Sequence, residues 1–378
     1  MNKLIYKNLS AFHPGYYIKE LIEEMEITQN EFALRLDTTG KTLSKLVNGE
    51  IPLSKNLAEN LALMTGTSVS VWLNLQLKYD EQCCFIECER KLDAEQNRLK
   101  MLHYDYFADL GFVENCFDKK QQIKELCRAL NVASLGVLEK QDLLTACKTS
   151  VNAVDIKNVV NANAWIQLGK IIARDINCKP YSQDNLIKAI PIFRDLTCDN
   201  LSETFIKIQQ IFFECGVALV ALPYMKDSGL NGAVQWLNNN KAMLLINDRG
   251  QDAAKFWFTL FHEINHILHK KTTFTYLSSD KHSTILSLGR NNKEEENLAD
   301  EFAKNQLIPP VAYKKFIANK NFSFSAIQKF ADDIGIAAYM VIGRLKHDKF
   351  LDWSNFTKNQ PHYQFVSPKF DSNQKSKG

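Results

Sequence analysis

The apolar positions of the chain follow a helical period over most of its first half. Between Tyr17 and about Leu219, hydrophobic residues recur three and four positions apart, which predicts a largely helical structure. Two short apolar runs, 215–225 and 242–248, break this period; each is bounded by Gly, Pro or Asn, and the segment 232–237 lies between them. We therefore expect two or three strands that form a small sheet.

A tightly connected pair of helices is predicted near the N-terminus. Thr28 can cap a helix whose third residue is Glu31, which is a T-x-x-E capping pattern. Thr39 can cap the next helix, and Asn48 and Gly49 end it. Two short helices joined in this way form a helix-turn-helix, in which the second helix enters the major groove of DNA.

Five residues of this pair are the predicted DNA contacts. The second helix would present Lys41, Thr42, Ser44 and Lys45 to the DNA, and Gln29 at the start of the first helix would contact a phosphate. The alternative is a helix-turn-helix retained for protein docking, because the N-terminal eighty residues hold eight Lys and Arg against nine Asp and Glu.

Residues 8 to 80 resemble the HigA-like antitoxin branch of the Cro/C1-type regulators. The resemblance is carried by "HPG" at 13–15, "LSKLVNG" at 43–49 and "WLNLQ" at 72–76. It implies that operator DNA and a toxin are partners. Regulators of this kind bind paired half-sites, so we also expect a homodimer.

The segment "FTLFHEINHILHKK" carries the residues with the clearest chemistry. His262 and His266 are four positions apart, which on a helix means a rotation of about 40° and a rise of about 6 Å, so both imidazoles can reach one Zn²⁺. Glu263 lies beside the first histidine, where it can act as the general base of an H-E-x-x-H metallopeptidase. The surrounding residues are strongly apolar, which predicts a buried helix in which unpartnered polar side chains would be costly. His269, one turn further, is expected to lie at the surface or behind the ligands.

A catalytic zinc site needs a third protein ligand, and "KEEENLADEFAKNQLIPP" supplies candidates. Glu296 falls on the buried side of this predicted helix, and Asp300 lies one turn further on that side. We assign Glu296 as the third ligand and Asp300 as the carboxylate that fixes the tautomer of one ligand histidine. Spacing alone leaves Glu295 open as the ligand.

The pattern E-x-x-A-[DN]-x-F-A-x-x-x-L-x-P after an H-E-x-x-H helix resembles the ImmA/IrrE zinc metallopeptidases. The chain matches it with Glu296, Ala299, Asp300, Phe302, Ala303, Leu307 and Pro309. The resemblance covers about residues 205 to 355 and favours Glu296 over Glu295. It implies hydrolysis of a peptide bond, and the strand 232–237 could align an extended peptide by edge pairing.

The fold class expected from these patterns is mainly α with a small α+β domain. The predicted parts are an all-α helix-turn-helix domain at 1–80, a helical linker that senses or dimerises at 81–200, a zincin-like domain with a small sheet at 201–355, and a tail at 356–378. The leading functional hypothesis is a DNA-bound regulator whose zinc endopeptidase cleaves a helix-turn-helix repressor or its own chain. The alternative is a non-catalytic antitoxin or repressor that uses the zincin-like domain to bind a toxin or ligand.

Net charge, apolar stretches and cysteine content do little to separate these two functional hypotheses. The formal net charge of +3 and pI near 8.2 do not by themselves indicate nucleic acid or a membrane. No signal peptide and no apolar stretch of about 18 residues is present, so we expect a cytoplasmic protein with no membrane contact. Nine scattered cysteines are expected to be reduced packing residues.

Overall fold

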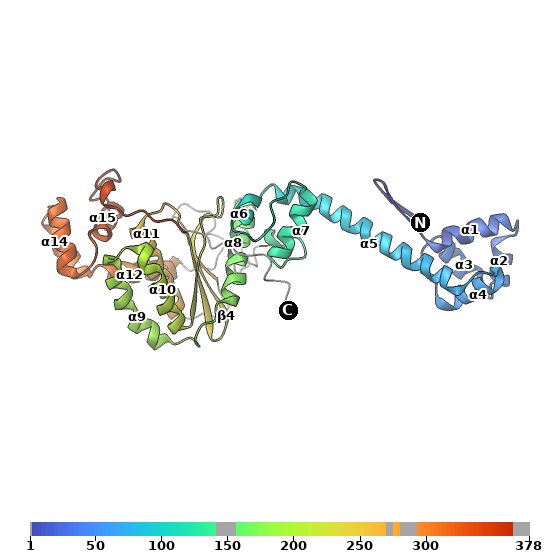
Figure 1. The fold of residues 1–378 in the computed structure, drawn as a ribbon, viewed down its shortest axis with the longest axis horizontal. Helices are drawn as coiled ribbons and strands as arrows, with labels where there is room; N and C mark the ends of the chain where they lie inside the picture. The colour runs from blue at the N-terminus through green and yellow to red at the C-terminus, as the bar shows by residue number, and fades with distance from the viewer. Residues whose placement is uncertain (1, 141–155, 270–274, 280–292, 366–378) are drawn as a thin grey trace. The chain divides into compact units, whose positions relative to one another are not determined.

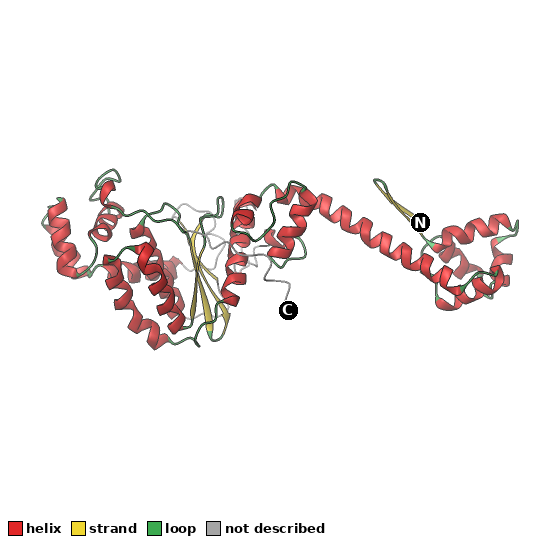
Figure 2. Cartoon of the chain, in the orientation of Figure 1, coloured by secondary structure: helices red, strands yellow, loops and turns green. Residues whose placement is uncertain are grey.

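The computed structural model of the chain describes residues 2–140, 156–269, 275–279 and 293–365. It divides into two compact units, Met1–Gln96 and Asn97–Gly378, and each is described by itself. Helices dominate both units, as the sequence predicts (Figure 2). None of the described helices combines the length and the apolar character that a membrane span requires.

The first unit is a bundle of short helices with one hairpin. Its elements are β1 (Lys3–Tyr6), β2 (Leu9–Phe12), α1 (Pro14–Glu24), α2 (Gln29–Arg35), α3 (Gly40–Val47), α4 (Lys55–Thr65) and α5 (Val69–Leu99) (Figure 1). The two strands pair antiparallel, and the sequence patterns did not predict them. Phe32, Leu36, Leu43 and Leu46 are fully buried, so the apolar stripes of the predicted helix pair form the centre of this core.

Capping residues fix where the helices of this unit begin. The hydroxyl of Thr28 accepts a hydrogen bond from the amide of Glu31 at 3.2 Å, and that of Thr39 accepts one from the amide of Thr42 at 3.1 Å. Both contacts confirm the predicted helix starts. The side chain of Glu31 pairs with Arg35, so only half of the expected capping box forms.

The boundary between the two units lies later in the chain than residue 80, where the sequence predicted it, because helix α5 continues past that residue. This helix runs without a break from Val69 to Leu99, and the division falls between Gln96 and Asn97. The hairpin belongs to the first unit partly because Tyr6 and Lys7 bind the carboxylate of Asp93 on this helix.

The second unit has a four-stranded sheet between helices. Its elements in chain order are α6 (Tyr104–Asp109), α7 (Lys119–Ala129), η1 (Leu135–Glu139), α8 (Ile156–Asp175), α9 (Gln183–Asp195), η3 (Leu196–Cys198), α10 (Leu201–Cys215), β3 (Val217–Ala221), β4 (Leu230–Asn238), β5 (Lys241–Ile246), α11 (Ala253–Leu268), β6 (Thr275–Ser279), α12 (Lys293–Leu307), α13 (Pro310–Ala318), α14 (Phe324–Ile334), α15 (Ala338–His347) and η5 (Thr357–Asn359). The three predicted strand segments are confirmed as β3, β4 and β5.

The strand order is β3-β5-β4-β6. β3 and β5 are parallel, whereas β4 is antiparallel to both of its neighbours, β5 and β6. Figure 1 shows α8 on one face of this sheet and α9 to α12 on the other. Because α8 packs directly on β3, β4 and β5, the predicted linker 81–200 is not a separate part of the chain. Its second half is a layer of the sheet domain.

The predicted tail at 356–378 is wrong for its first ten residues. Tyr363 is buried in the core of the second unit, and the amide of Ala253 at the start of α11 donates a hydrogen bond to the carbonyl of Pro361. The side chain of Gln360 donates to Asp252, the residue that caps α11. Residues 360–365 therefore hold the beginning of α11, and residues 366–378 lie outside the described part of the chain.

The eight cysteines in the described part of the chain are all free thiols, as expected, and Cys147 lies outside it. Their expected role in packing holds only for some of them. Cys215 is buried, whereas Cys84, Cys88 and Cys198 are exposed.

Candidate functional site

Helix α11 places His262 and His266 in the interior of the second unit. Asp252 caps its first turn, and apolar neighbours bury almost the whole helix. The two histidines are 4% and 2% exposed. Their Nε2 atoms are 3.0 Å apart, so the i, i+4 spacing brings both rings to one point, as the sequence predicts.

Helix α12 brings Glu296 to the same point. Its Oε2 lies 3.2 Å from Nε2 of His262, and its Oε1 lies 3.3 Å from Nε2 of His266. Among the described residues, this trio is the group of His, Cys, Asp or Glu side chains whose ligand atoms converge closely enough for a metal ion. The predicted ligands therefore come together, although they arise from two helices some thirty positions apart.

The spacing of these atoms fits a tetrahedral ion. Two ligands at about 2.0–2.1 Å from a tetrahedral Zn²⁺ lie roughly 3.3 Å apart, close to the separations within the trio. Two imidazole nitrogens and one carboxylate are a common protein donor set for catalytic zinc. His262, His266 and Glu296 could therefore hold such an ion and leave its fourth position open.

Asp300 lies behind the trio on the next turn of α12. Its Oδ1 is 3.0 Å from Nδ1 of His262. With the proton of this imidazole on Nδ1, that nitrogen donates to Asp300, and Nε2 is left to face the centre of the trio. This is the position that was predicted for Asp300.

Glu263 is fully buried, and neither of its carboxylate oxygens has a hydrogen-bond partner in the described part of the chain. Its burial, opposed by the nearby His262, raises the pKa of this carboxyl to about 8. The backbone of β4 approaches it closely, because a Cβ at Gly232 would lie 2.7 Å from Oε1 of Glu263. A buried carboxyl without a protein partner is costly unless another group, such as water or substrate, binds it.

Burial and mutual hydrogen bonds shift the pKa values of all three side chains of the trio. At His262, burial works against the charged form, but hydrogen bonds with Asp300 and Glu296 outweigh it and raise the pKa to about 10. At His266, burial dominates and lowers the pKa. At Glu296, hydrogen bonds with both histidines overcome the effect of burial and lower the pKa to about 2. The carboxylates of Glu296 and Asp300 therefore stabilise a positive charge on His262, whereas burial disfavours one on His266.

Two neighbouring residues lie outside the trio. Glu295, which spacing alone left open as a ligand, is on α12 beside Glu296 but is not part of the converging group. His269 is exposed, and its Nδ1 lies 2.8 Å from the carbonyl of Asn265. The expectation that it lies at the surface is confirmed.

The strand 232–237 was predicted to align a peptide by edge pairing, but neither of its edges is open in the structure. β4 has β5 on one side and β6 on the other, so both of its edges are paired. The sequence patterns missed both β6 and the close approach of Gly232 to Glu263. A glycine within an apolar strand pattern was a usable signal for the second feature, because it often marks a close backbone approach.

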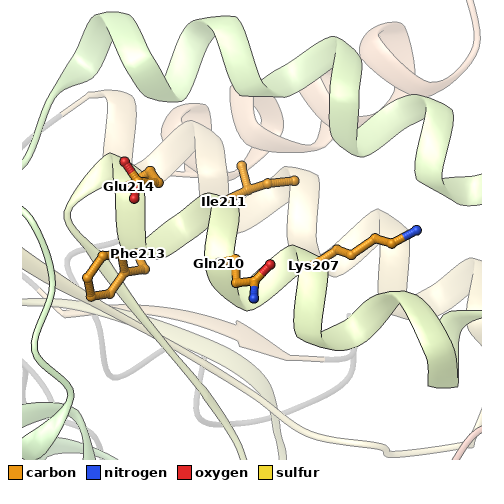
Figure 3. Close-up of a pocket in the computed structure, with 5 residues that line it drawn as sticks. All are labelled: Lys207, Gln210, Ile211, Phe213 and Glu214. Carbon is orange, nitrogen blue, oxygen red and sulfur yellow. The ribbon is translucent and has the colours of Figure 1, made fainter.

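Figure 3 shows a shallow hollow elsewhere on the second unit, lined by Lys207, Gln210, Ile211, Phe213 and Glu214. All five residues come from α10, and none of them is a predicted site residue. The hollow is therefore separate from the histidine trio and holds no cluster of catalytic groups.

The helix-turn-helix surface lies in the first unit. Lys41 and Lys45 of α3 are exposed, and Thr42, Ser44 and Gln29 are partly exposed. The structure therefore leaves the five predicted DNA contacts accessible. The hydroxyl of Thr42 lies 2.8 Å from that of Thr39, which holds it at the start of α3.

Comparisons with known proteins concern this helix-turn-helix. The family model described as helix-turn-helix matches residues 18–72. The chain is 31% identical over 85 residues to the uncharacterized HTH-type transcriptional regulator YddM of Escherichia coli (strain K12), covering 22% of this chain and 86% of that protein. It is 38% identical over 77 residues to virulence-associated protein A' of Dichelobacter nodosus, covering 19% of this chain and 67% of that protein.

A solved structure gives a further likeness. The crystal structure of a protein described as an antidote of a plasmid maintenance system, from Nostoc punctiforme PCC 73102, is 25% identical. The match covers 22% of this chain and 92% of that chain, with a TM-score of 0.22. Each of these likenesses covers about a fifth of the chain, so the histidine trio is interpreted from its own geometry.

Proposed function

Because the chain belongs to the helix-turn-helix family through its N-terminal domain, we propose that it is a DNA-binding regulator that also carries a zinc-dependent endopeptidase. The observation that carries the second part is the convergence of His262, His266 and Glu296 beside the buried carboxyl of Glu263. The proposed substrate is a regulatory protein partner, such as a helix-turn-helix repressor, or the chain itself.

DNA binding rests on the helix-turn-helix and on its relatives. YddM is named as a transcriptional regulator, and the Nostoc punctiforme protein is described as an antidote of a plasmid maintenance system. In a helix-turn-helix the start of the second helix meets the base edges, and here it carries the exposed Lys41 and Lys45. Operator DNA is therefore the proposed partner of the first unit, which would bind as a homodimer.

Peptide hydrolysis rests on the arrangement of the second unit and on its resemblance to the ImmA/IrrE metallopeptidases. His262, His266 and Glu296 would hold Zn²⁺, and Asp300 would orient the ring of His262. The ion would supply Lewis acidity for the scissile carbonyl and for the attacking water. Glu263 would take the proton of that water and deliver it to the leaving amine, which its buried position and raised pKa suit.

A Glu263→Gln variant tests the catalytic role. The amide keeps the size of the carboxyl but cannot accept a proton, so cleavage of the partner or of the chain should stop while zinc content and thermal stability stay near those of the parent. Glu295→Gln is the matched control, because it changes a neighbouring acid outside the trio. If Glu263→Gln cleaves as fast as the parent, the endopeptidase proposal fails.

One observation favours a second candidate, a non-catalytic antitoxin or repressor whose second unit binds a toxin or ligand. The strand that would align a peptide substrate is already paired on both edges. Under this alternative, Glu263→Gln would leave toxin neutralisation and repression unchanged, and no cleavage product would form with either protein.

A further inference from the structure

The edge of β4 that faces β6 lies next to the proposed catalytic carboxyl. Gly232 of β4 is in direct contact with Glu263, and α11 packs against β4, β5 and β6. β4 is also the one strand that runs antiparallel to the other three. A peptide that paired with this edge in the antiparallel sense would therefore pass close to Glu263 and would run in the direction of β6.

The chain's own segment Thr275–Ser279 already takes that place. Ser278 is paired with Gly232, Leu277 with Ala233, and Tyr276 with Val234, all in the antiparallel sense. Backbone pairing of this kind depends little on sequence, so a strand of the chain and a strand of a partner would compete for the same amides and carbonyls.

We propose that Thr275–Ser279 is a built-in occupant of the peptide-binding edge of β4, so that an extended polypeptide pairs with β4 only after this strand is displaced. The inference rests on the proposed peptidase function, because it gives this edge its role. It also identifies the form of the substrate, which is an extended segment with at least five residues free to pair along β4.

Two features of the sheet make β6 the strand that can leave. It is at the end of the strand order and pairs only with β4, whereas β4 and β5 each have two neighbours. Its register with β4 also shifts between Leu230 and Gly232, which shortens the regular ladder. An edge strand with a short ladder opens more readily than a central strand.

Tethering makes β6 an effective competitor even though its ladder is short. Residues 280–292 connect it to α12, and residues 269–274 connect it to α11. Strands held by such short connections compete at an effective concentration on the order of mM. A free peptide should therefore bind weakly to the intact chain and at least tenfold more tightly once β6 can no longer pair.

The test uses the full-length chain with Glu263→Gln, so that no cleavage interferes, and a fluorescent peptide with the sequence of residues 273–281. In one variant, residues 275–279 are replaced by Gly-Ser-Gly-Ser-Gly, which pairs poorly. In the matched control they are replaced by Thr-Val-Thr-Val-Thr, which still forms a strand. Fluorescence anisotropy measures binding, and hydrogen exchange measures protection of the amides at 232–235.

The Gly/Ser variant should bind the peptide at least tenfold more tightly than the parent and the control. Its amides at 232–235 should exchange faster, and added peptide should restore their protection. Equal affinity in the three proteins, or no binding to any of them, would overturn the proposal. So would exchange at 232–235 that is the same in all three proteins.

A second variant keeps the proposal testable if the Gly/Ser replacement unfolds the domain. Gln235 is paired with Thr275, so Gln235→Cys with Thr275→Cys can form a cross-strand disulfide that holds β6 on β4. The oxidised protein should bind no peptide, and dithiothreitol should restore the weak binding of the parent. Peptide binding that is unchanged by oxidation would contradict the proposal.

These readouts separate this inference from the proposed function. None of them requires zinc or cleavage. If the Gly/Ser variant gains peptide affinity but the unmodified chain never cleaves a protein, the peptidase proposal fails and the occupied edge stands. If the chain cleaves a partner but the Gly/Ser replacement changes neither peptide affinity nor amide exchange, the peptidase proposal stands and the occupied edge fails.

Discussion

Gly232 on β4 and Glu263 on α11 are in contact so close that the strand has no room for a side chain at this position. A Cβ there would lie 2.7 Å from Oε1 of Glu263. The only carboxyl of the H-E-x-x-H segment thus lies directly against the sheet. The position of the proposed general base is set by the strand as well as by its own helix.

A Gly232→Ala substitution should therefore displace Glu263 without removing a metal ligand. We expect kcat/KM for protein cleavage to fall by about 10²-fold or more, which is the scale of a lost general base, while zinc content stays at that of the parent. Steady-state kinetics would measure kcat/KM, and metal analysis would measure the zinc content. Asn240→Ala, in the exposed turn after β4, is the control. Full activity of Gly232→Ala would show that Glu263 does not depend on this contact.

Asp300 should tune metal affinity rather than hold the ion. Its carboxylate is 3.0 Å from Nδ1 of His262, and loss of such a partner typically costs about 10–100-fold in affinity. Asp300→Asn should weaken zinc binding by that factor in a competition titration with a chromophoric chelator. Glu301→Gln, on the exposed side of the same helix, should leave affinity unchanged. Equal affinities of the two variants would remove the assigned role of Asp300.

Lys41 and Lys45 should contribute to DNA binding through salt-dependent contacts. Each lysine that neutralises a phosphate adds roughly 0.9 to the slope of log K against log salt concentration. Lys41→Ala and Lys45→Ala should each weaken binding to a fixed duplex and reduce that slope by about one. Lys78→Ala on α5 serves as the control, since it lies outside the helix-turn-helix pair. Unchanged affinity together with an unchanged slope in both test variants would favour protein docking over DNA binding.

The helix pair formed by α13 and α15 should lose stability in acid through Asp348. This carboxylate accepts hydrogen bonds from Tyr313, Arg344 and His347. Burial opposes its charge, but the bonds from His347 and Arg344 outweigh burial and lower its pKa below 3.8. A lowered carboxyl pKa stabilises the fold above the unfolded value and loses that contribution as the pH falls through the folded one.

Asp348→Asn should therefore unfold at a lower temperature than the parent at pH 7, by a few degrees for a loss of about 1 kcal/mol. This difference in unfolding temperature should begin to narrow near pH 3.8 and should shrink further as the pH falls towards the lower pKa of the folded protein. Differential scanning calorimetry between pH 7 and pH 3 would follow it. Asp352→Asn, at an exposed position, should show no such change. A gap that is independent of pH would mean that the charge of Asp348 contributes nothing.

The features of the fold and the site that could be predicted from the sequence are those set by the spacing of residues along one helix. His262 and His266 meet because an i, i+4 pair on a helix shares a face, and Thr28 and Thr39 begin helices because their hydroxyls reach amides three residues later. Spacing alone did not predict that Glu296 meets the histidines, because Glu295 fitted the same helix face. The family resemblance was needed to choose Glu296 over Glu295.

The features that the sequence did not predict depend on partners distant in the sequence. β6 has only five residues, and its place beside β4 is set by backbone pairing with a strand some forty positions earlier. Residues 360–365 are polar enough to suggest a tail, but Tyr363 and the carbonyl of Pro361 find partners around residues 247–253. The length of α5 was accessible, because residues 69–99 contain neither Gly nor Pro.

Measuring the metal content of the protein would show whether His262, His266 and Glu296 bind zinc. The full-length protein, purified without chelators or a metal-affinity column, would be analysed by inductively coupled plasma mass spectrometry beside Glu296→Ala and Glu295→Ala. We expect about one zinc per chain in the parent and in Glu295→Ala, and almost none in Glu296→Ala. A parent without zinc, or a Glu296→Ala variant that retains it in full, would show that this trio is not a zinc site.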